Sequence, residues 1–238
     1  WSLTLLAGPG HNDAEEIIVA VNDRRNGRVD MTELLECKIN GINVIDYCSF
    51  FELATGHLPL NALNASWLVF SDGFKRDPIR LMAKRVFDIC VSLLLLILMT
   101  PLMTATAIAV VLESKGPIFY RQVRVGEYGK TFAIWKFRSM RTDAEKDGVA
   151  RWAQSNDTRV TRVGRFIRLT RIDELPQLFN VLLGDMSFVG PRPERPEFTS
   201  QLEHDIPYYS NRHAVRPGIT GWAQIRYPYG ASIDDARR

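Results

Sequence analysis

The sequence predicts an α/β protein in two parts: a partial Rossmann-like parallel α/β module, then a mainly helical, monotopic membrane domain with a re-entrant helix and a small β-hairpin. Three observations predict it. Residues 1–72 alternate strand-like and helix-like runs. Residues 89–112 are 24 residues without a charged side chain. Two alternating stretches flank the turn sequence GEYGK, a pattern typical of a hairpin.

The first region offers elements but no catalytic constellation. Strand-like runs over 15–21 and 41–47 alternate with helix-like runs over 30–40 and 48–56. This β-α-β-α order predicts part of a small parallel sheet. A glycine-rich stretch near the start lacks the GxGxxG spacing of a dinucleotide loop, so we interpret it as a plain turn.

The uncharged segment is preceded by a basic linker and amphipathic lead-in, residues 73–88, and is long enough for a transmembrane helix. Two features argue against a simple span. Pro101 lies at its centre, where it removes a helix hydrogen bond. Basic residues also lie at both ends, with Lys84 before the segment and Lys115 after it. The positive-inside rule therefore places both ends on the cytoplasmic side.

Each half of the segment, 89–100 and 102–112, would reach only roughly 16–18 Å as a helix, whereas a bilayer core is about 30 Å thick. We therefore expect a re-entrant helix that breaks at Thr100 and Pro101 and returns to the same face. Hydroxyl groups of Ser92, Thr100 or Thr104 could satisfy the freed carbonyl groups. A kinked spanning helix and a buried core helix are the alternatives.

The chain from Lys115 to Arg171 is strongly basic, with 14 Lys or Arg against 5 Asp or Glu. Such a surface indicates phosphate-bearing partners: nucleic acid, nucleotide or anionic lipid. The hairpin within this region is expected to carry Arg and Lys on one face and apolar residues on the other. The three cysteines are widely spaced and form no CxxC pair, so they suggest neither a disulfide framework nor a zinc site, which fits a reducing compartment.

Two adjacent carboxylates, Asp173 and Glu174, follow a ladder of arginines spaced three residues apart. On a helix these arginines would form a positive stripe; they are Arg162, Arg165, Arg168 and Arg171. We expect Asp173 to be the N-cap of a helix that runs to Gly184, with Pro176 in its first turn. A cap and a helix-dipole partner would be enough to explain an Asp-Glu pair at a helix start.

The surroundings favour chemistry instead. A helix N-terminus together with Arg168 and Arg171 would bind phosphate, and the same field would lower the pKa of a carboxyl group there. An ionised Asp173 beside a phosphoanhydride is a plausible nucleophile. Glu174 could hold a divalent cation that bridges phosphate oxygens. Arg192, fixed between two prolines, could act as a second phosphate clamp.

Several long stretches, in order, carry a family resemblance. They are KRVFD, the proline-broken apolar segment, GPIFYRQVRVG, KFRSM, IDELPQLFNVLLGDMSFVGPRP and RPGITGWAQ, and together they cover about 60% of the chain. On these the chain resembles the monotopic phosphoglycosyl transferases, bacterial sugar transferases that begin polysaccharide assembly. The upstream part looks like the exopolysaccharide-type subfamily with a Rossmann-like (CoA-binding-like) module, and residues 113–238 are then the catalytic domain.

The resemblance implies transfer of hexose 1-phosphate from a UDP-sugar to polyprenyl (undecaprenyl) phosphate with release of UMP. In the implied ping-pong route, Asp173 carries a covalent phosphosugar, Glu174 binds Mg²⁺ and Arg168 grips phosphate. Lys136 and Arg138, within KFRSM, are expected to bind phosphate or substrate as well. The implied location is the cytoplasmic face of the bacterial inner membrane. The donor would be UDP-glucose or UDP-galactose, and homo-oligomer formation stays open.

Such relatives usually carry spanning helices upstream and a helical segment downstream, so we expect this chain to be a fragment truncated at its C-terminus. Two other functions compete. The first is a catalytically silent membrane scaffold for a polysaccharide assembly complex, against which the intact carboxylate pair argues. The second is a nucleic-acid binder, suggested by the basic excess with Trp135, Phe137 and Trp152; it would need neither the apolar segment nor the adjacent carboxylates, so no nucleic acid is expected.

Overall fold

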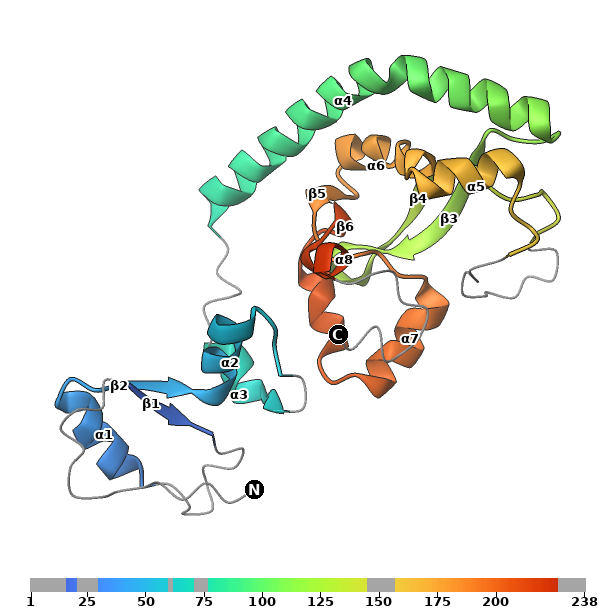
Figure 1. Cartoon of the computed structure of the whole chain (residues 1–238). Helices are drawn as coiled ribbons and strands as arrows, with labels where there is room; N and C mark the ends of the chain where they lie inside the picture. The colour runs from blue at the N-terminus through green and yellow to red at the C-terminus, as the bar shows by residue number, and fades with distance from the viewer. Residues whose placement is uncertain (1–15, 21–29, 60–61, 71–76, 145–156, 227–238) are drawn as a thin grey trace. The chain divides into compact units, whose positions relative to one another are not determined.

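The structure of the protein, a computed structural model, describes residues 16–20, 30–59, 62–70, 77–144 and 157–226 (Figure 1). The chain divides into two compact units, Trp1–Lys75 and Arg76–Arg238, which are described separately. The glycine-rich stretch near the start and Trp152 lie outside the described residues.

The first unit follows the expected order of elements. They are β1 (Glu16–Val19), α1 (Met31–Ile39), β2 (Asn43–Asp46), α2 (Tyr47–Thr55) and α3 (Ala65–Phe70). Strands β1 and β2 pair in parallel, with Ile17 opposite Val44. Asp30 caps α1 by accepting a hydrogen bond from the Thr32 amide, and Asp46 caps α2 in the same way. The predicted β-α-β-α order and parallel pairing are confirmed.

The second unit begins with one long helix, α4 (Pro78–Glu113), drawn in green and visibly bent in Figure 1. Asp77 caps it and Pro78 stands in its first turn. Two expectations need correction. Most of the lead-in that precedes residue 89 is the first three turns of this helix and not a separate linker. The helix also continues through Thr100 and Pro101, where we expected it to break.

Two hydroxyl groups inside α4 bond to carbonyl groups near Pro101. Thr100 Oγ1 donates to the Leu96 carbonyl at 2.6 Å, and Thr104 Oγ1 donates to the Thr100 carbonyl at 2.9 Å. Neither of these acceptors is the carbonyl four residues before Pro101, which is the group that the missing proline N–H would have bonded. Ser92, the third expected hydroxyl, is fully buried and has no partner among the described residues.

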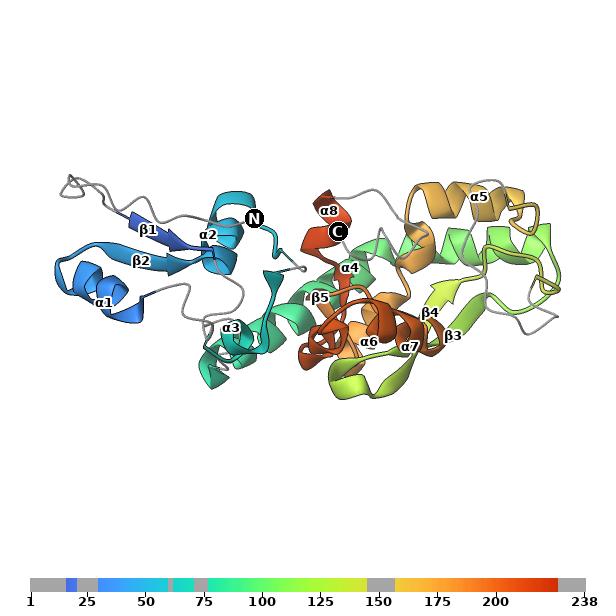
Figure 2. The ribbon, with the colours of Figure 1, turned by 90° about the horizontal axis from the view of Figure 1, so that it is seen from below.

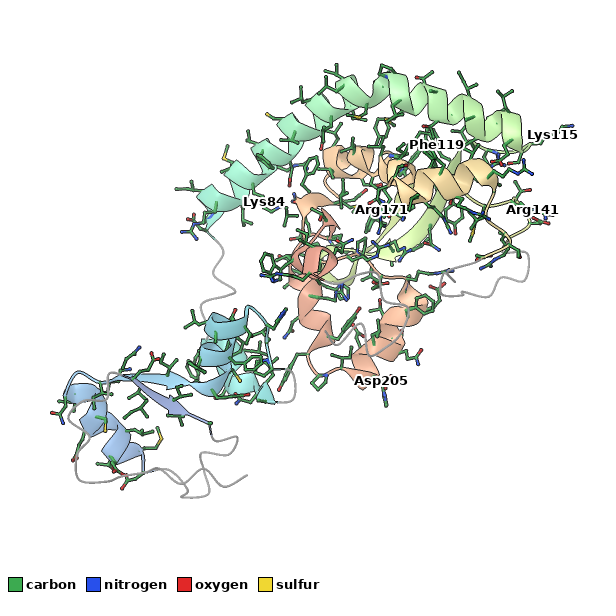
Figure 3. All side chains as sticks on the ribbon, viewed as in Figure 1. Lys84, Lys115, Phe119, Arg141, Arg171 and Asp205 are labelled. Atoms are coloured by element: carbon green, nitrogen blue, oxygen red, sulfur yellow. The ribbon has the colours of Figure 1, made fainter. Side chains whose placement is uncertain are left out.

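Both ends of α4 are bonded to the rest of this unit, and Figure 3 shows Lys84 and Lys115 at these opposite ends. Near the first end, Arg85 donates to the carbonyl groups of Val181 and Leu182 at 2.6 and 2.8 Å. At the other end, Glu113 accepts hydrogen bonds from the backbone N–H groups of Arg162 and Val163.

The middle of α4 is apolar and largely uncovered. Large exposed side chains there include Leu93, Leu94, Ile97, Leu98 and Ile108. By length and composition this is the one described helix that could cross a membrane, with a mean hydropathy of 2.4 and 17% of its most apolar window buried. Helices α5 (Arg162–Leu169) and α6 (Gln177–Leu183) lie along its inner side (Figures 1 and 2).

The expected hairpin is confirmed: β3 (Phe119–Val125) pairs antiparallel with β4 (Thr131–Phe137). The expected division of its faces is wrong. Arg121 lies opposite Trp135 on the face that also carries Phe119, and its guanidinium lies 3.8 Å from the Trp135 ring centre. This cation–π contact lets an arginine stay on the apolar face. Lys136 is on the opposite face.

The remaining elements complete the unit around two clusters of buried apolar residues. They are β5 (Ser187–Val189), α7 (Pro196–Asp205), β6 (Gly218–Thr220) and α8 (Trp222–Arg226), with β5 and β6 parallel. One cluster, around Phe137, joins the hairpin to α4 and α5. The other, around Ile134 and Val181, joins it to α6 and β5. The hairpin is therefore held from both faces.

Candidate active site

The carboxylate pair lies in a short connection between α5 and α6. Helix α5 ends at Leu169, and Arg171 adopts a left-handed conformation with φ of 60°. A 3₁₀ turn over Ile172–Glu174 follows, and α6 begins only at Gln177. We expected Asp173 to be the N-cap of α6, and this is wrong: Pro176 occupies that position. The left-handed residue also takes Arg171 off the helix, so the arginine stripe ends at Arg168. Gly184 ends α6 as expected.

Glu174 is surrounded by cations. Lys136 Nζ donates to Glu174 Oε1 at 2.7 Å, and both side chains are mostly buried. Arg171 Nη1 lies 3.8 Å and Arg192 Nη2 4.0 Å from the same oxygen. Burial alone would raise the pKa of Glu174, but Lys136 and Arg192 outweigh it and hold that pKa below its usual value. Glu174 is thus held ionised.

Asp173 has a different environment although it is the neighbouring residue. It is 6% exposed, and its Oδ1 has no hydrogen-bond partner among the described residues. Burial raises the pKa of this carboxyl group, and the negative charge of Glu174 raises it further against the pull of Lys136 and Arg168. The expected lowering of the pKa by the arginine field is therefore wrong for Asp173, because burial outweighs the cations.

Asp173 lines a cavity of about 500 Å³, within the range of small-molecule sites. The structure brings most of the expected residues together on its wall: Lys136, Arg138, Arg168 and Arg192. Arg168 is oriented by a 2.8 Å hydrogen bond from its Nε to Ser139 Oγ. Arg171 does not line the cavity; its guanidinium lies beside Glu174, and its charge also acts on Asp173.

Arg138 has a second task that the sequence did not reveal. Its Nη1 donates to the Lys115 carbonyl at 2.9 Å, and its Nη2 donates to those of Val110 and Ser114 at 3.3 and 2.6 Å. These are carbonyl groups at the C-terminal end of α4, which favours a cation. Arg138 therefore joins the cavity wall to the end of the long helix.

The loop that carries Arg192 is fixed by residues far away in the sequence. Arg212 donates from Nη2 to the Arg192 carbonyl at 2.8 Å, and Arg124 donates to the Pro193 carbonyl at 3.1 Å. The Gly218 amide donates to the Pro191 carbonyl at 2.9 Å. The sequence analysis missed Arg124 and Arg212. Arg124 lies within the basic stretch from Lys115 to Arg171 whereas Arg212 lies beyond it, and nothing local distinguishes either from other arginines.

The donor set limits how a divalent cation could bind. The described residues contain no group of three His, Cys, Asp or Glu side chains that could hold a metal. Asp173 and Glu174 can supply at most a pair of carboxylates, of which Asp173 Oδ1 is the oxygen without a partner. Mg²⁺ commonly uses one or two carboxylates and takes its other ligands from water and substrate phosphate. The residues fit that mode of binding and not an all-protein site.

Comparison with known proteins is consistent with this geometry. The family described as "Bacterial sugar transferase" matches residues 79–237. A protein of Aeromonas hydrophila, "UDP-N-acetylgalactosamine-undecaprenyl-phosphate N-acetylgalactosaminephosphotransferase", is 46% identical over 204 residues, which are 86% of this chain and 47% of that protein. Because the second unit, Arg76–Arg238, has fewer than 204 residues, this similarity must extend into the first unit.

Two further relatives are named for glucose. "Undecaprenyl-phosphate glucose phosphotransferase" of Komagataeibacter xylinus is 51% identical over 156 residues, 64% of this chain and 29% of that protein. "UDP-glucose:undecaprenyl-phosphate glucose-1-phosphate transferase" of Klebsiella pneumoniae is 52% identical over 147 residues, 62% of this chain and 31% of that protein. The chain thus spans less than half the length of these three relatives.

Proposed function

The chain belongs to the bacterial sugar transferase family, and from this we propose that it transfers hexose 1-phosphate from a UDP-sugar to polyprenyl (undecaprenyl) phosphate and releases UMP. One observation carries the proposal. A buried carboxylate with an unpartnered oxygen, Asp173, lines a cavity whose wall also carries Lys136, Arg168 and Arg192. A nucleophile among cations suits a substrate that carries a phosphoanhydride.

The proposed route has two steps and balances without another reactant. Asp173 attacks the β-phosphorus of the UDP-sugar, a bond forms from its oxygen to phosphorus, and the bond to the bridging oxygen breaks, so UMP leaves. An oxygen of polyprenyl phosphate then attacks the same phosphorus and frees Asp173. Arg168 and Arg192, which line the same cavity as Asp173, would bind the equatorial oxygens, whose charge must be stabilised in both steps.

Mg²⁺ is the proposed cofactor. Glu174 would hold it, together with phosphate oxygens and water, and the cation would supply charge stabilisation to the departing phosphate. Glu174 is kept ionised by Lys136 and Arg192, which suits a ligand to a divalent cation. Lys136 would then be shared between Glu174 and the substrate phosphates.

The membrane arrangement is also a proposal: α4 enters the inner membrane and returns to the cytoplasmic face. Its support is that Arg85 and Glu113, near the two ends of α4, are bonded to the same folded unit. A helix whose two ends are fixed to one water-exposed domain has both ends on one side of a bilayer. Its uncovered apolar middle is then the part that enters the hydrocarbon.

The test is UMP release from a panel of UDP-sugars in detergent, with Mg²⁺ and polyprenyl phosphate. The panel is needed because the relatives are named for different sugars. We expect release with one or few donors, as the first membrane step of exopolysaccharide synthesis requires. With donor alone, the mass of the protein should increase by one hexose phosphate.

Asp173→Asn should abolish both the release and the mass increase, because the amide cannot attack phosphorus. Asp205→Asn, at the end of α7 and outside the cavity, is the matched control and should keep both (Figure 3). Turnover by Asp173→Asn would remove Asp173 as the nucleophile. If the intact chain released no UMP from any donor, that result would favour the scaffold role.

A further inference from the structure

The cavity wall is not only cationic. Around Asp173 it carries the cations described above. Along β3 and α7 it also carries aromatic and amide side chains, Tyr120, Gln122 and Phe198, together with Arg124 and Arg195. Phosphates explain the arginines, but they do not explain an amide and aromatic rings in the same wall. That combination is typical of sites that bind a planar heterocycle, since the rings supply stacking surface and the amide supplies directional hydrogen bonds.

The side-chain amide of Gln122 is held in one orientation. Its Oε1 accepts a 2.6 Å hydrogen bond from Arg124 Nη2, and its Nε2 donates to Tyr120 Oη at 3.2 Å. Because a guanidinium can only donate, the amide oxygen must be the atom that faces Arg124. An amide nitrogen has two N–H groups and an amide oxygen has two lone pairs. Gln122 therefore has one donor and one acceptor left for a ligand in the cavity.

The position of Gln122 fits the far end of a nucleotide. Tyr120 lies opposite Lys136 in the hairpin, and Gln122 is two residues further along β3, an offset of about 7 Å along the strand from that pair. That spacing leaves room for a ribose. The two ends of the hairpin contact different parts of the unit. Arg138 bonds the open end to α4, whereas at the other end the Val125 amide donates to the Glu194 carbonyl. Gln122 thus lies on the side away from the membrane helix.

We propose that Gln122 reads the uracil base of the donor, its remaining N–H donating to O4 of the base and its Oε1 accepting from N3–H. Tyr120 and Phe198 form the aromatic walls of this base subsite. The inference rests on the proposed function, since it names how the same cavity would select a uridine nucleotide. It leaves the side of the cavity nearest α4 for the lipid phosphate.

The test measures binding and does not depend on turnover. The probes are UMP and 3-methyl-UMP, in which the N3 proton is replaced by a methyl group. Equilibrium dialysis with the 238-residue chain, in detergent with Mg²⁺, gives the two dissociation constants. Gln122 would form two hydrogen bonds with the base. We therefore expect the unaltered chain to prefer UMP by roughly tenfold or more.

Gln122→Met keeps the length of the side chain and removes both polar atoms, so this variant should bind the two probes within about twofold of each other. Gln122→Glu keeps an acceptor for N3–H but loses the donor to O4, so it should bind both probes more weakly and keep the preference for UMP, which guards against a folding defect in the first variant. Gln201→Met, exposed on α7, is the matched control and should keep the original ratio.

The inference is overturned if UMP does not bind, if the unaltered chain binds both probes equally, or if Gln122→Met keeps the original ratio. Failure of the proposed function looks different. A chain that prefers UMP through Gln122 but forms no phosphosugar adduct and releases no UMP would have a uridine site without the proposed chemistry.

Discussion

Lys136 Nζ lies 2.7 Å from Glu174 Oε1, so strand β4 is bonded directly to the turn that carries Asp173. The two residues are 38 positions apart in the chain. Together with Arg192, this ion pair keeps Glu174 ionised, and Lys136 also lines the cavity, whereas Asp173 Oδ1 has no hydrogen-bond partner among the described residues.

Lys136→Met should lower the stability of the protein by about 3 kcal/mol, because it leaves a mostly buried Glu174 without its nearest cation. It should also remove most activity, since the cavity loses a phosphate-binding charge. Thermal unfolding in detergent and UMP release measure the two effects. Lys130→Met, on the exposed turn of the same hairpin, is the control and should change neither. An unaltered melting temperature for Lys136→Met would mean that the pair contributes nothing to the fold.

The acidic limb of the pH profile should follow Asp173. Attack requires the ionised carboxylate, and burial raises its pKa, so kcat/KM should fall with decreasing pH at a higher pH than an ordinary aspartate would give. The charge of Glu174 contributes to that raised pKa. Glu174→Gln should therefore move the limb to lower pH, measured at saturating Mg²⁺, whatever its effect on the maximal rate. A limb that stays in place would show that another group limits the reaction.

Asn180 should prove to be a structural anchor of the site. It is fully buried; its Oδ1 accepts from the Trp135 amide at 3.0 Å, and its Nδ2 donates to the Ala133 carbonyl at 2.8 Å. Asn180→Leu has similar volume but leaves both backbone groups unpaired, at a cost of about 1–3 kcal/mol each. A clear fall in melting temperature is expected, whereas Asn211→Leu, at an exposed position, should have little effect. Equal melting temperatures would contradict the anchor role.

Both flanks of α4 should be accessible from the same side of the membrane. Single cysteines at Arg80 and Lys115, in a chain whose three cysteines are changed to serine, should both react with an impermeant maleimide in inverted vesicles and neither in spheroplasts. Labelling of the two positions from opposite sides would establish a spanning helix instead.

The same assay separates the proline from the bonded ends as the cause of this topology. Pro101→Ala should leave both flanks on the cytoplasmic face, because Arg85 and Glu113 still bind the folded unit. If Pro101→Ala moved one flank to the other side, the proline and not these bonds would set the return.

Local patterns in the sequence predicted the elements whose cause is local. The alternation of β1, α1, β2 and α2, the hairpin and the end of α6 at Gly184 follow from periodicity, caps and turn residues. The expected N-cap at Asp173 was wrong because the left-handed conformation of Arg171 starts a 3₁₀ turn first. An arginine gives no indication in the sequence that it will adopt a left-handed conformation.

The site was predicted only in part, because some of its features are local in the sequence and others form only on folding. The carboxylate pair and the arginines near it were visible as a cluster in the sequence. The raised pKa of Asp173 depends on burial, and the supports of Arg192 come from Arg124 and Arg212, which only folding brings close. The continuity of α4 through Pro101 was also missed, because the proline indicated a break.

Arg138 is bonded to the last carbonyl groups of α4 and also lines the cavity. Any change in the tilt of α4 must therefore move part of the wall against which the substrates bind. Apolar helices adjust their tilt to the thickness of the surrounding lipid, at a modest cost per ångström of mismatch. If α4 lies in the bilayer as proposed, we expect acyl-chain length to act on the cavity through this guanidinium group, so that substrate affinity changes with the lipid in which the protein is assayed.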